Sequence, residues 1–427
     1  MKKVFFTTIL ALLTTLVFAQ SPLRKGADAC FDKQIKTLQL RKLDSEMTDP
    51  VILLKSSERL QLSFDDMSSE KRYFSYKIVL CDADWNESNL FHSDYLDGFP
   101  DDYLSSCELS FNSQVAYAHY SLTIPNPQMQ IKLSGNYLLK VFDSGSMQEP
   151  LFQKSFSVAE PSPINVRAHV RTRPLAGNAP CSQQLEFSVE HPSLNIRPYT
   201  ELKVRVTQNG FRFTQLPNPA PTFVRNNAVD FSEYGKNLYS GGSEYRSFDI
   251  SSLEYKTLRV RDIELIDDRF HVRLEDDIPF TQYIFSNDMN GRYLIRNQLY
   301  RDESRFRSEY PSVYLSLHMK QPLKGTVYIF GELSNWELSN DFVMLYNTPR
   351  QAYEVTLPLK QGYYSYKYVY VDESGALDMG KIDGCSSEAE NIYGVYVYYR
   401  GVTDRHDRLM NVTFISSMGD MEKRRQP

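Results

Sequence analysis

The ten residues Gly362–Val371, GYYSYKYVYV, decide the fold class of this chain. Tyrosine stands at every second position from Tyr364 to Tyr370. A period of two places these rings on one face of a β-strand, because successive side chains of a strand point to opposite sides of the sheet. We expect at least half of the tyrosines to pack in a core and pair across strands. The alternative is a surface that binds a sugar or another protein.

The same alternation of apolar and polar residues recurs along the chain. Glycine-containing turn signals, such as QNG at 208–210 and DMNG at 288–291, separate the alternating segments. No helical stripe longer than two or three turns competes with this pattern. The sequence therefore predicts an all-β protein made of tandem immunoglobulin-like or early-set β-sandwich domains. The other alternating segments are 60–64, 118–124, 185–189, 202–206, 270–274, 313–319 and 353–359.

Two breaks divide the chain into segments. AEPSPI at 159–164 contains two prolines with one residue between them. Proline has no backbone N–H to donate, so this stretch cannot be part of a central strand. RDESRFRSEYPS at 301–312 is a charged interruption before another alternating strand. We therefore expect a signal peptide, three β-sandwich domains, of which the last is early-set-like, and a polar C-terminal extension. Their predicted bounds are 1–19, 20–160, 161–305, 306–402 and 403–427.

The first residues have the pattern of an export signal. Two lysines precede a short apolar run, and the small residues before position 20 suit cleavage between Ala19 and Gln20. The alternative is an N-terminal membrane anchor, although the run is shorter than the ~20 apolar residues that a span needs. No cysteine follows the cleavage site to carry a lipid. We expect a periplasmic protein that does not itself span the membrane.

Charge and cysteine content narrow the function further. The formal net charge is −5, and removal of Lys2 and Lys3 with the signal lowers it to −7, which makes nucleic acid a poor partner. No CxxC pair supports a zinc site. The five cysteines form an odd set in which Cys81 could bridge to Cys107, or all could be buried thiols. The pairing stays open among Cys30, Cys81, Cys107, Cys181 and Cys385.

No recognisable catalytic pattern appears in the sequence. HExxH, GxSxG, Walker and GxGxxG motifs are all absent, so we expect no enzyme, no cofactor and no small-molecule substrate. DADWNES at 82–88 begins like an EF-hand loop, but Glu87 stands where the loop needs glycine and Ser93 where it needs glutamate. A turn held by side-chain bonds is the commoner use of such a run, and another kind of calcium site is the alternative.

The last predicted domain resembles the early-set module that carries family 48 carbohydrate-binding domains. The likeness rests on GTVYIFGELSNW at 325–336 and on YSYKYVYVD at 364–372. Such a module would make Trp336 a glycan platform. The family places a second tryptophan after the VD turn, whereas this chain reads ESGALDMG there and has no aromatic residue before Tyr393. A periplasmic glycan-binding protein is therefore our alternative function.

The chain as a whole resembles the plug protein of the Bacteroidetes type IX secretion system. The likeness rests on YKIVLCDADWNESNL at 76–90, YSGGSEYRSFDISSLEYKTLRV at 239–260 and VYYRGVTDRHDRLMNV at 397–412, which occur in that order. It implies a non-catalytic periplasmic protein that docks on the giant outer-membrane translocon barrel and closes its pore in the idle state. Contacts often lie on loops, and the predicted partner-binding residues are Trp85, Tyr95 and Phe99. The alternative is a structural corner around Trp85.

Overall fold

The computed structural model defines the architecture of most of the chain. The expected signal peptide at 1–19 and the end of the predicted C-terminal extension, 420–427, lie outside the described residues. The structure describes residues 26, 28–43, 45–68, 71–172, 181–192, 194–210, 218–233 and 235–419.

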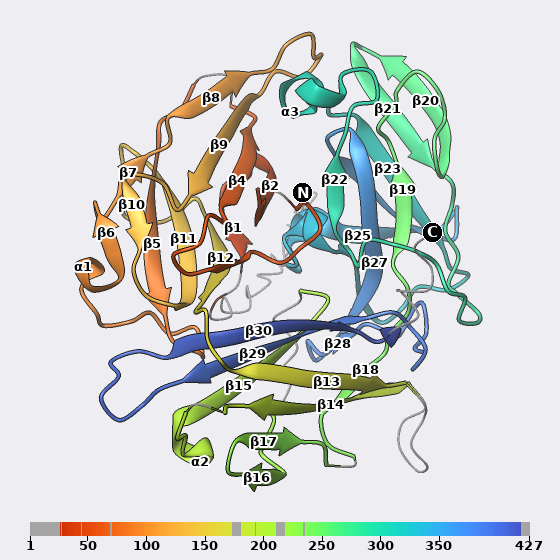
Figure 1. Cartoon of the computed structure of the whole chain (residues 1–427). Coiled ribbons are helices and arrows are strands. Elements are labelled where there is room, and N and C mark those ends of the chain that lie inside the picture. The colour runs from red at the N-terminus through yellow and green to blue at the C-terminus, as the bar shows by residue number, and fades with distance from the viewer. Residues whose placement is uncertain are drawn as a thin grey trace, which may run out of the picture.

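The predicted all-β fold is confirmed, with strands gathered into three bodies that pack against one another (Figure 1). The α-helices among the described residues are single turns: α1 (His92–Tyr95), α2 (Pro198–Glu201) and α3 (Ser304–Arg307). Short 3₁₀ turns, η1 to η3, lie in the third body. They span Arg301–Glu303, Glu332–Ser334 and Asn340–Phe342.

The first body is a sandwich of two sheets from one continuous stretch of chain. One sheet has the order β1-β12-β11-β5-β7, with β3 parallel to β12, and the other has the order β2-β4-β9-β8. Side chains of both sheets share one core, and β6 pairs with β10 at its side. Its strands are β1 (Ala29–Cys30), β2 (Ile35–Lys42), β3 (Val51–Leu53), β4 (Leu60–Asp66), β5 (Phe74–Cys81), β6 (Leu96–Gly98), β7 (Asp102–Tyr103), β8 (Ser106–Leu109), β9 (Ala118–Ile124), β10 (Met129–Ile131), β11 (Gly135–Asp143) and β12 (Phe152–Ala159).

The second body combines the middle of the chain with its end. A sheet of order β13-β14-β17-β16, with β18 on β14, faces a sheet of order β15-β29-β30, and their side chains form one core. In Figure 1, β29 and β30 run along the boundary with the other two bodies. The strands are β13 (Asn165–Arg171), β14 (Ser182–Glu190), β15 (Leu202–Gln208), β16 (Phe223–Arg225), β17 (Ala228–Phe231), β18 (Leu238–Ser240), β29 (Ile392–Tyr399) and β30 (Arg408–Ser416).

The third body is built on a ten-stranded sheet of order β19-β27-β24-β25-β26-β23-β21-β20, with β22 and β28 also on β27. Its residues between β19 and β28 share one apolar core. The strands are β19 (Arg246–Asp249), β20 (Val260–Ile266), β21 (Arg269–Leu274), β22 (Tyr293–Ile295), β23 (Ser312–His318), β24 (Gly325–Phe330), β25 (Val343–Asn347), β26 (Ala352–Pro358), β27 (Gly362–Asp372) and β28 (Leu377–Asp378).

The sheets divide the chain differently from the predicted bounds 161–305 and 306–402. Strands β22 and β23 lie on opposite sides of the charged break, yet both belong to the ten-stranded sheet. Strand β29 leaves the third body and pairs with β15 from Tyr393 to Tyr399. The predicted extension 403–427 also contains β30, whose Leu409 and Met410 are buried. The boundary near residue 160 coincides with the end of the first body.

The tyrosine face of β27 is core along its length. Tyr364, Tyr366, Tyr368 and Tyr370 are all buried, and each hydroxyl has an acceptor. The opposite face is buried too, because Ser365, Lys367 and Val369 are 0 to 4% exposed. The prediction that at least half of these tyrosines pack inside is confirmed.

A disulfide joins Cys181, at the start of β14, to Cys385, in the connection between β28 and β29. The expected alternative of a Cys81–Cys107 bridge is wrong, because these two thiols stand free in different sheets of the first body. Cys30 is free as well. Burial raises the pKa of the Cys30 and Cys81 thiols to about 12, so both stay protonated and unreactive.

We expect Cys181→Ser to lower the free energy of unfolding by about 2–5 kcal/mol, because the bridge closes a loop of 204 residues in the unfolded chain. Urea titration would measure the loss, and dithiothreitol should reproduce it in the wild type. Cys107→Ser is the matched control and should behave as the wild type. An unchanged urea midpoint after reduction would contradict the prediction.

Candidate docking surface and its supporting junctions

The carboxylate of Asp65 is the polar centre of the junction between the first and third bodies. It is fully buried at the end of β4. Lys360 Nζ and the Tyr310 hydroxyl, both from the third body, donate to Oδ2 at 2.5 Å. Within the first body, His119 Nδ1 lies 2.6 Å from Oδ1. Burial alone would raise the pKa of Asp65, but the Lys360 ammonium and the His119 ring outweigh it and hold that pKa below its usual value.

A second polar contact joins the same two bodies. Arg41, in β2, pairs with Glu332 at 2.7 Å and also donates to the backbone carbonyl of Tyr293. Nearby, Arg292 of the third body pairs with Asp49 of the first. These side chains are largely buried, so each charge requires its partner across the boundary.

The second body is attached to the first by the end of the chain. The Asp407 carboxylate accepts the backbone N–H of Ala83 at 3.0 Å. Arg408 pairs with Glu160 at 2.6 Å, and the buried Tyr398 hydroxyl donates to Asn136 at 2.9 Å. The contact therefore depends on the β29–β30 hairpin.

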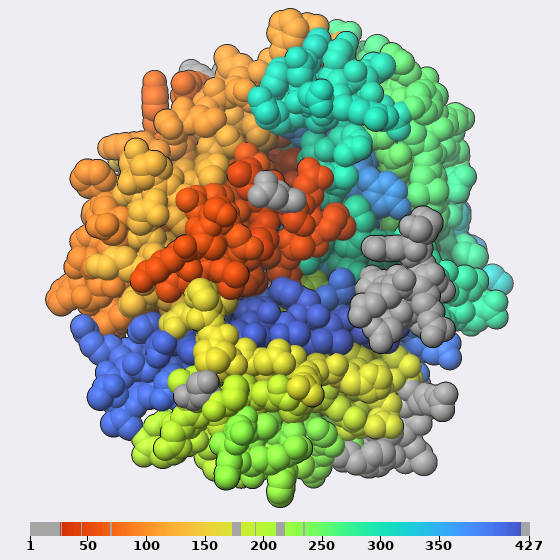
Figure 2. Space-filling view, viewed as in Figure 1, coloured from red at the N-terminus to blue at the C-terminus, as the bar shows by residue number. Residues whose placement is uncertain are grey.

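The second body is attached to the third by the disulfide and by a buried amide. Gln183 Nε2, on β14, donates to the carbonyls of Ser387 and Ala389, in the connection that leaves β28, at 2.9 and 2.7 Å. Each body therefore contacts both others through satisfied polar groups as well as apolar packing. The space-filling view shows the three bodies in close contact around a common centre (Figure 2).

Lys360→Met should lower the free energy of unfolding by about 3–5 kcal/mol, because it leaves the Asp65 carboxylate buried without a countercharge. Denaturant titration at pH 7 would measure it. Lys320→Met, at an exposed lysine of the same body, is the control. Adding Asp65→Asn to Lys360→Met should restore part of the loss, since the unpaired charge is then gone. A cost below about 1 kcal/mol would show that the pair is not needed.

A carboxyl group at the same junction responds to pH. Burial, and then the charge of Asp28, raises the pKa of Glu337 to about 7. Lys154 offsets little of this because it is paired with Asp28 at 2.6 Å. A carboxyl whose folded pKa is raised contributes most to stability at low pH, and the contribution is lost as pH rises through the folded pKa.

Between pH 5 and pH 8, the wild type should therefore lose about 1–3 kcal/mol of unfolding free energy relative to Glu337→Gln. The comparison requires denaturant titrations of both proteins across this range. Glu373→Gln, in the exposed turn after β27, should leave the wild-type pH dependence in place. Parallel profiles for the wild type and Glu337→Gln would refute the expectation.

The three residues predicted to bind a partner have different surroundings. Trp85 lies in a turn with a φ of +62°, and its ring packs directly over Gly26. Tyr95 is buried, with its ring 6.2 Å from that of Tyr137. Only Phe99 presents most of its side chain to solvent. The structure therefore does not bring the three together into one exposed surface.

The DADWNES run forms a turn held by its own side chains. Asp82 Oδ1 accepts the backbone N–H groups of Asp84 and Asn86, at 2.8 and 2.9 Å. The predicted turn with side-chain-to-backbone bonds is therefore confirmed. Among the described residues, no group of three or more histidine, cysteine, aspartate or glutamate side chains could hold a metal ion.

Trp336, the residue of the glycan alternative, is packed at its edges. Its ring meets Phe330 and Tyr245 at interplanar angles of 71° and 89°, and Gly291 lies close enough that a Cβ there would clash with the indole. A small cavity of about 60 Å³ adjoins the ring. Charged side chains such as Arg41 and Asp49 line it, so the site lacks the pair of open aromatic faces that a sugar platform needs.

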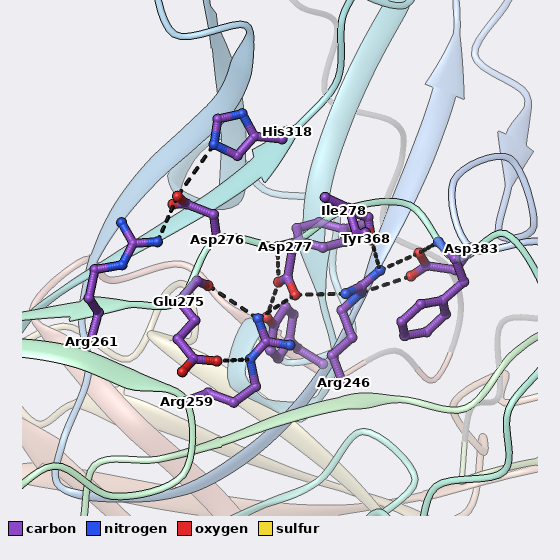
Figure 3. A network of polar contacts seen from close by, with 12 residues as sticks. Arg246, Arg259, Arg261, Glu275, Asp276, Asp277, Ile278, His318, Tyr368 and Asp383 are labelled. Carbon is purple, nitrogen blue, oxygen red and sulfur yellow. Dashed lines mark hydrogen bonds and ion pairs between the residues drawn. The ribbon is translucent and has the colours of Figure 1, made fainter.

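A buried charge network supports the long connection between β21 and β22 (Figure 3). Asp277 is 3% exposed and pairs with Arg246 and Arg259 at 2.7 and 2.8 Å, while the Tyr366 and Tyr368 hydroxyls both donate to it at 2.6 Å. The preceding residue, Asp276, points elsewhere and lies 2.6 Å from Arg261 and 3.3 Å from His318. This network fixes the start of a surface segment that carries apolar side chains.

That segment is an apolar stretch of loop, IPFTQYIF at 278–285. It contains no helix or strand, yet Ile278 and Ile284 are 63% and 68% exposed. No sequence motif marked this stretch as a site. The available signal was an apolar run without alternation between Asp277 and the DMNG turn, which by periodicity alone is also compatible with a short buried strand.

Sequence comparison finds a similarity to a described family over one part of the chain. Residues 35–160, which are nearly all of the first body, match the sequence model described as "Type 9 secretion system plug protein 1st domain". Neither this family nor the similar structure described below is named for a catalytic activity. No protein with a curated description matches the chain.

A solved structure is similar to almost the whole chain. It is a crystal structure of a hypothetical protein from Parabacteroides merdae ATCC 43184, with a TM-score of 0.86 and 29% sequence identity. The alignment covers 92% of this chain and 100% of the other, so the two share the arrangement of all three bodies. No helix in the described part of the chain has the length and apolar content that crossing a bilayer requires.

Proposed function

We propose that this protein is a non-catalytic plug of a type IX secretion system, which docks on the periplasmic opening of the outer-membrane translocon barrel and seals the idle pore. The match of residues 35–160 to the first domain of plug proteins supports this proposal.

The observation that carries the proposal is the mutual locking of the three bodies. A stopper for a wide aqueous pore must keep its shape under load. Hinged domains usually meet through small interfaces that leave their relative motion free. Here each pair of bodies is joined by buried polar contacts, among them Asp65 with Lys360 and Tyr398 with Asn136. Sliding one body against another would separate buried charges, which is costly.

The proposed compartment is the periplasm. The Cys181–Cys385 disulfide favours an oxidising compartment, where such bridges form and persist. The expected export signal at 1–19 points the same way. A plug must also release, so we infer a contact with the barrel that is more polar than the core of a permanent complex.

Deletion of the gene from the native host tests the sealing role. An open pore should admit large hydrophilic antibiotics that an intact outer membrane excludes, so the deletion strain should be at least several times more sensitive to them. Expression of the wild-type chain should restore resistance. The wild-type chain should also co-purify with the translocon barrel from envelopes in mild detergent.

Two outcomes would refute the proposal. One is a deletion strain whose sensitivity to large antibiotics equals that of the wild type while its translocon is present at normal levels. The other is a tagged wild-type chain that leaves envelopes without the barrel in cells that express both. A deletion strain lacking the barrel as well serves as the control that attributes any leak to the pore.

A further inference from the structure

The segment 278–285, which we call the apolar loop, is an exposed and pre-ordered surface. Ile278, Phe280 and Ile284 are 63, 41 and 68% exposed within seven residues of sequence. Irregular connections as long as the one between β21 and β22 are uncommon in compact proteins and are often functional. Apolar side chains gathered on such a connection mark an interaction site more often than chance exposure.

Contacts with the core hold the apolar loop in place at several points. Arg246 Nη2 donates to the carbonyl of Ile278 at 2.7 Å, and Asp383 Oδ1 accepts the backbone N–H of Phe280 at 3.4 Å (Figure 3). The Arg246 guanidinium also stacks on the Phe280 ring, 3.9 Å from its centroid. Further along, the Tyr283 hydroxyl donates to Glu244 at 2.5 Å. A loop ordered before binding loses little conformational entropy when it binds.

The surroundings of the apolar loop are acidic. The Tyr283 hydroxyl also contacts the backbone carbonyl of Glu388, a residue whose side chain is exposed. Glu390 donates its backbone N–H to the Glu244 carboxylate. Burial, and then the hydrogen bond to Glu244 and the charges of Glu244, Glu388 and Glu390, raise the pKa of Tyr283. Two lysines lie near these carboxylates. Lys381, in the adjoining segment 381–390, is exposed, whereas Lys367 is buried and offers no charge to a partner. In this segment the solvent-accessible carboxylates of Glu388 and Glu390 outnumber Lys381, which favours a partner surface with positive charge.

We propose that the apolar loop is the docking element of this chain, seating Ile278 and Ile284 in an apolar hollow edged by lysine or arginine on the periplasmic face of the translocon barrel. This inference rests on the proposed plug function. An anionic lipid surface is disfavoured as the occupant, because carboxylates around the loop would be repelled by it. A second copy of the chain would present the same acidic groups and is disfavoured for the same reason.

Binding of the purified full chain to the purified barrel in detergent tests the inference. Ile278→Glu combined with Ile284→Glu should weaken the affinity at least ~30-fold, as expected when interface anchors are lost. Phe223→Glu, at a 62% exposed residue on β16 of the second body, is the matched control and should bind within about threefold of the wild type. Glu388→Lys should weaken binding and make it less dependent on salt.

The outcomes separate the two proposals. If the wild-type chain shows no affinity for the barrel, the plug function fails. If the wild type binds and the loop variant binds equally well, the plug function stands and the docking inference is overturned. Loss of binding to phosphatidylglycerol vesicles or loss of self-association in the loop variant, with barrel affinity unchanged, would also overturn it. Thermal unfolding midpoints that match the wild type establish that the variants are folded. If the double glutamate variant does not fold, the double variant Ile278→Gln with Ile284→Gln takes its place in the binding measurement.

Discussion

The arrangement of this protein depends on the buried charge of Asp65. Pulling the first and third bodies fully apart would let water solvate both Asp65 and Lys360, so the pair adds little to the strength of the junction by itself. Its effect is on alignment. Any small slide that keeps the interface dry but separates Lys360 from Asp65 leaves two unpaired charges in a low-dielectric interior. The first body therefore has one favourable position against the third, and Arg41 with Glu332 imposes a similar condition nearby.

Local patterns in the sequence predicted the strands well because alternation is a property of a few consecutive residues. Segment 202–206 lies in β15, and all of segment 353–359 except its last residue lies in β26. Strand pairing is non-local, and this is where prediction failed. The tyrosine-rich strand β29 follows the third body in sequence and looks like its continuation, but its partner is β15, almost two hundred residues earlier in the chain. The Cys181–Cys385 bridge was unpredictable for the same reason.

The candidate site was predicted less well than the fold. Tyr95 and Trp85 were chosen because loops often carry contacts, yet the core of the first body takes up Tyr95 and Gly26 lies under Trp85. A position in a loop does not determine whether a ring faces solvent. Sequence neighbours can also differ in exposure. Asp276 pairs with Arg261 near the surface, whereas Asp277 is buried and accepts from the Tyr366 and Tyr368 hydroxyls.

The return of β29 and β30 to the second body affects how the chain can be assembled. A polypeptide that is synthesised from its N-terminus could complete the first body early. The sandwich around β15 would remain open at one sheet until about the last thirty-five residues arrive, and Cys181 would wait for Cys385. Contacts over such separations form slowly. A chain whose synthesis stops early would therefore expose an unpaired edge at β15, a target for proteases and chaperones, so only full-length molecules would mature.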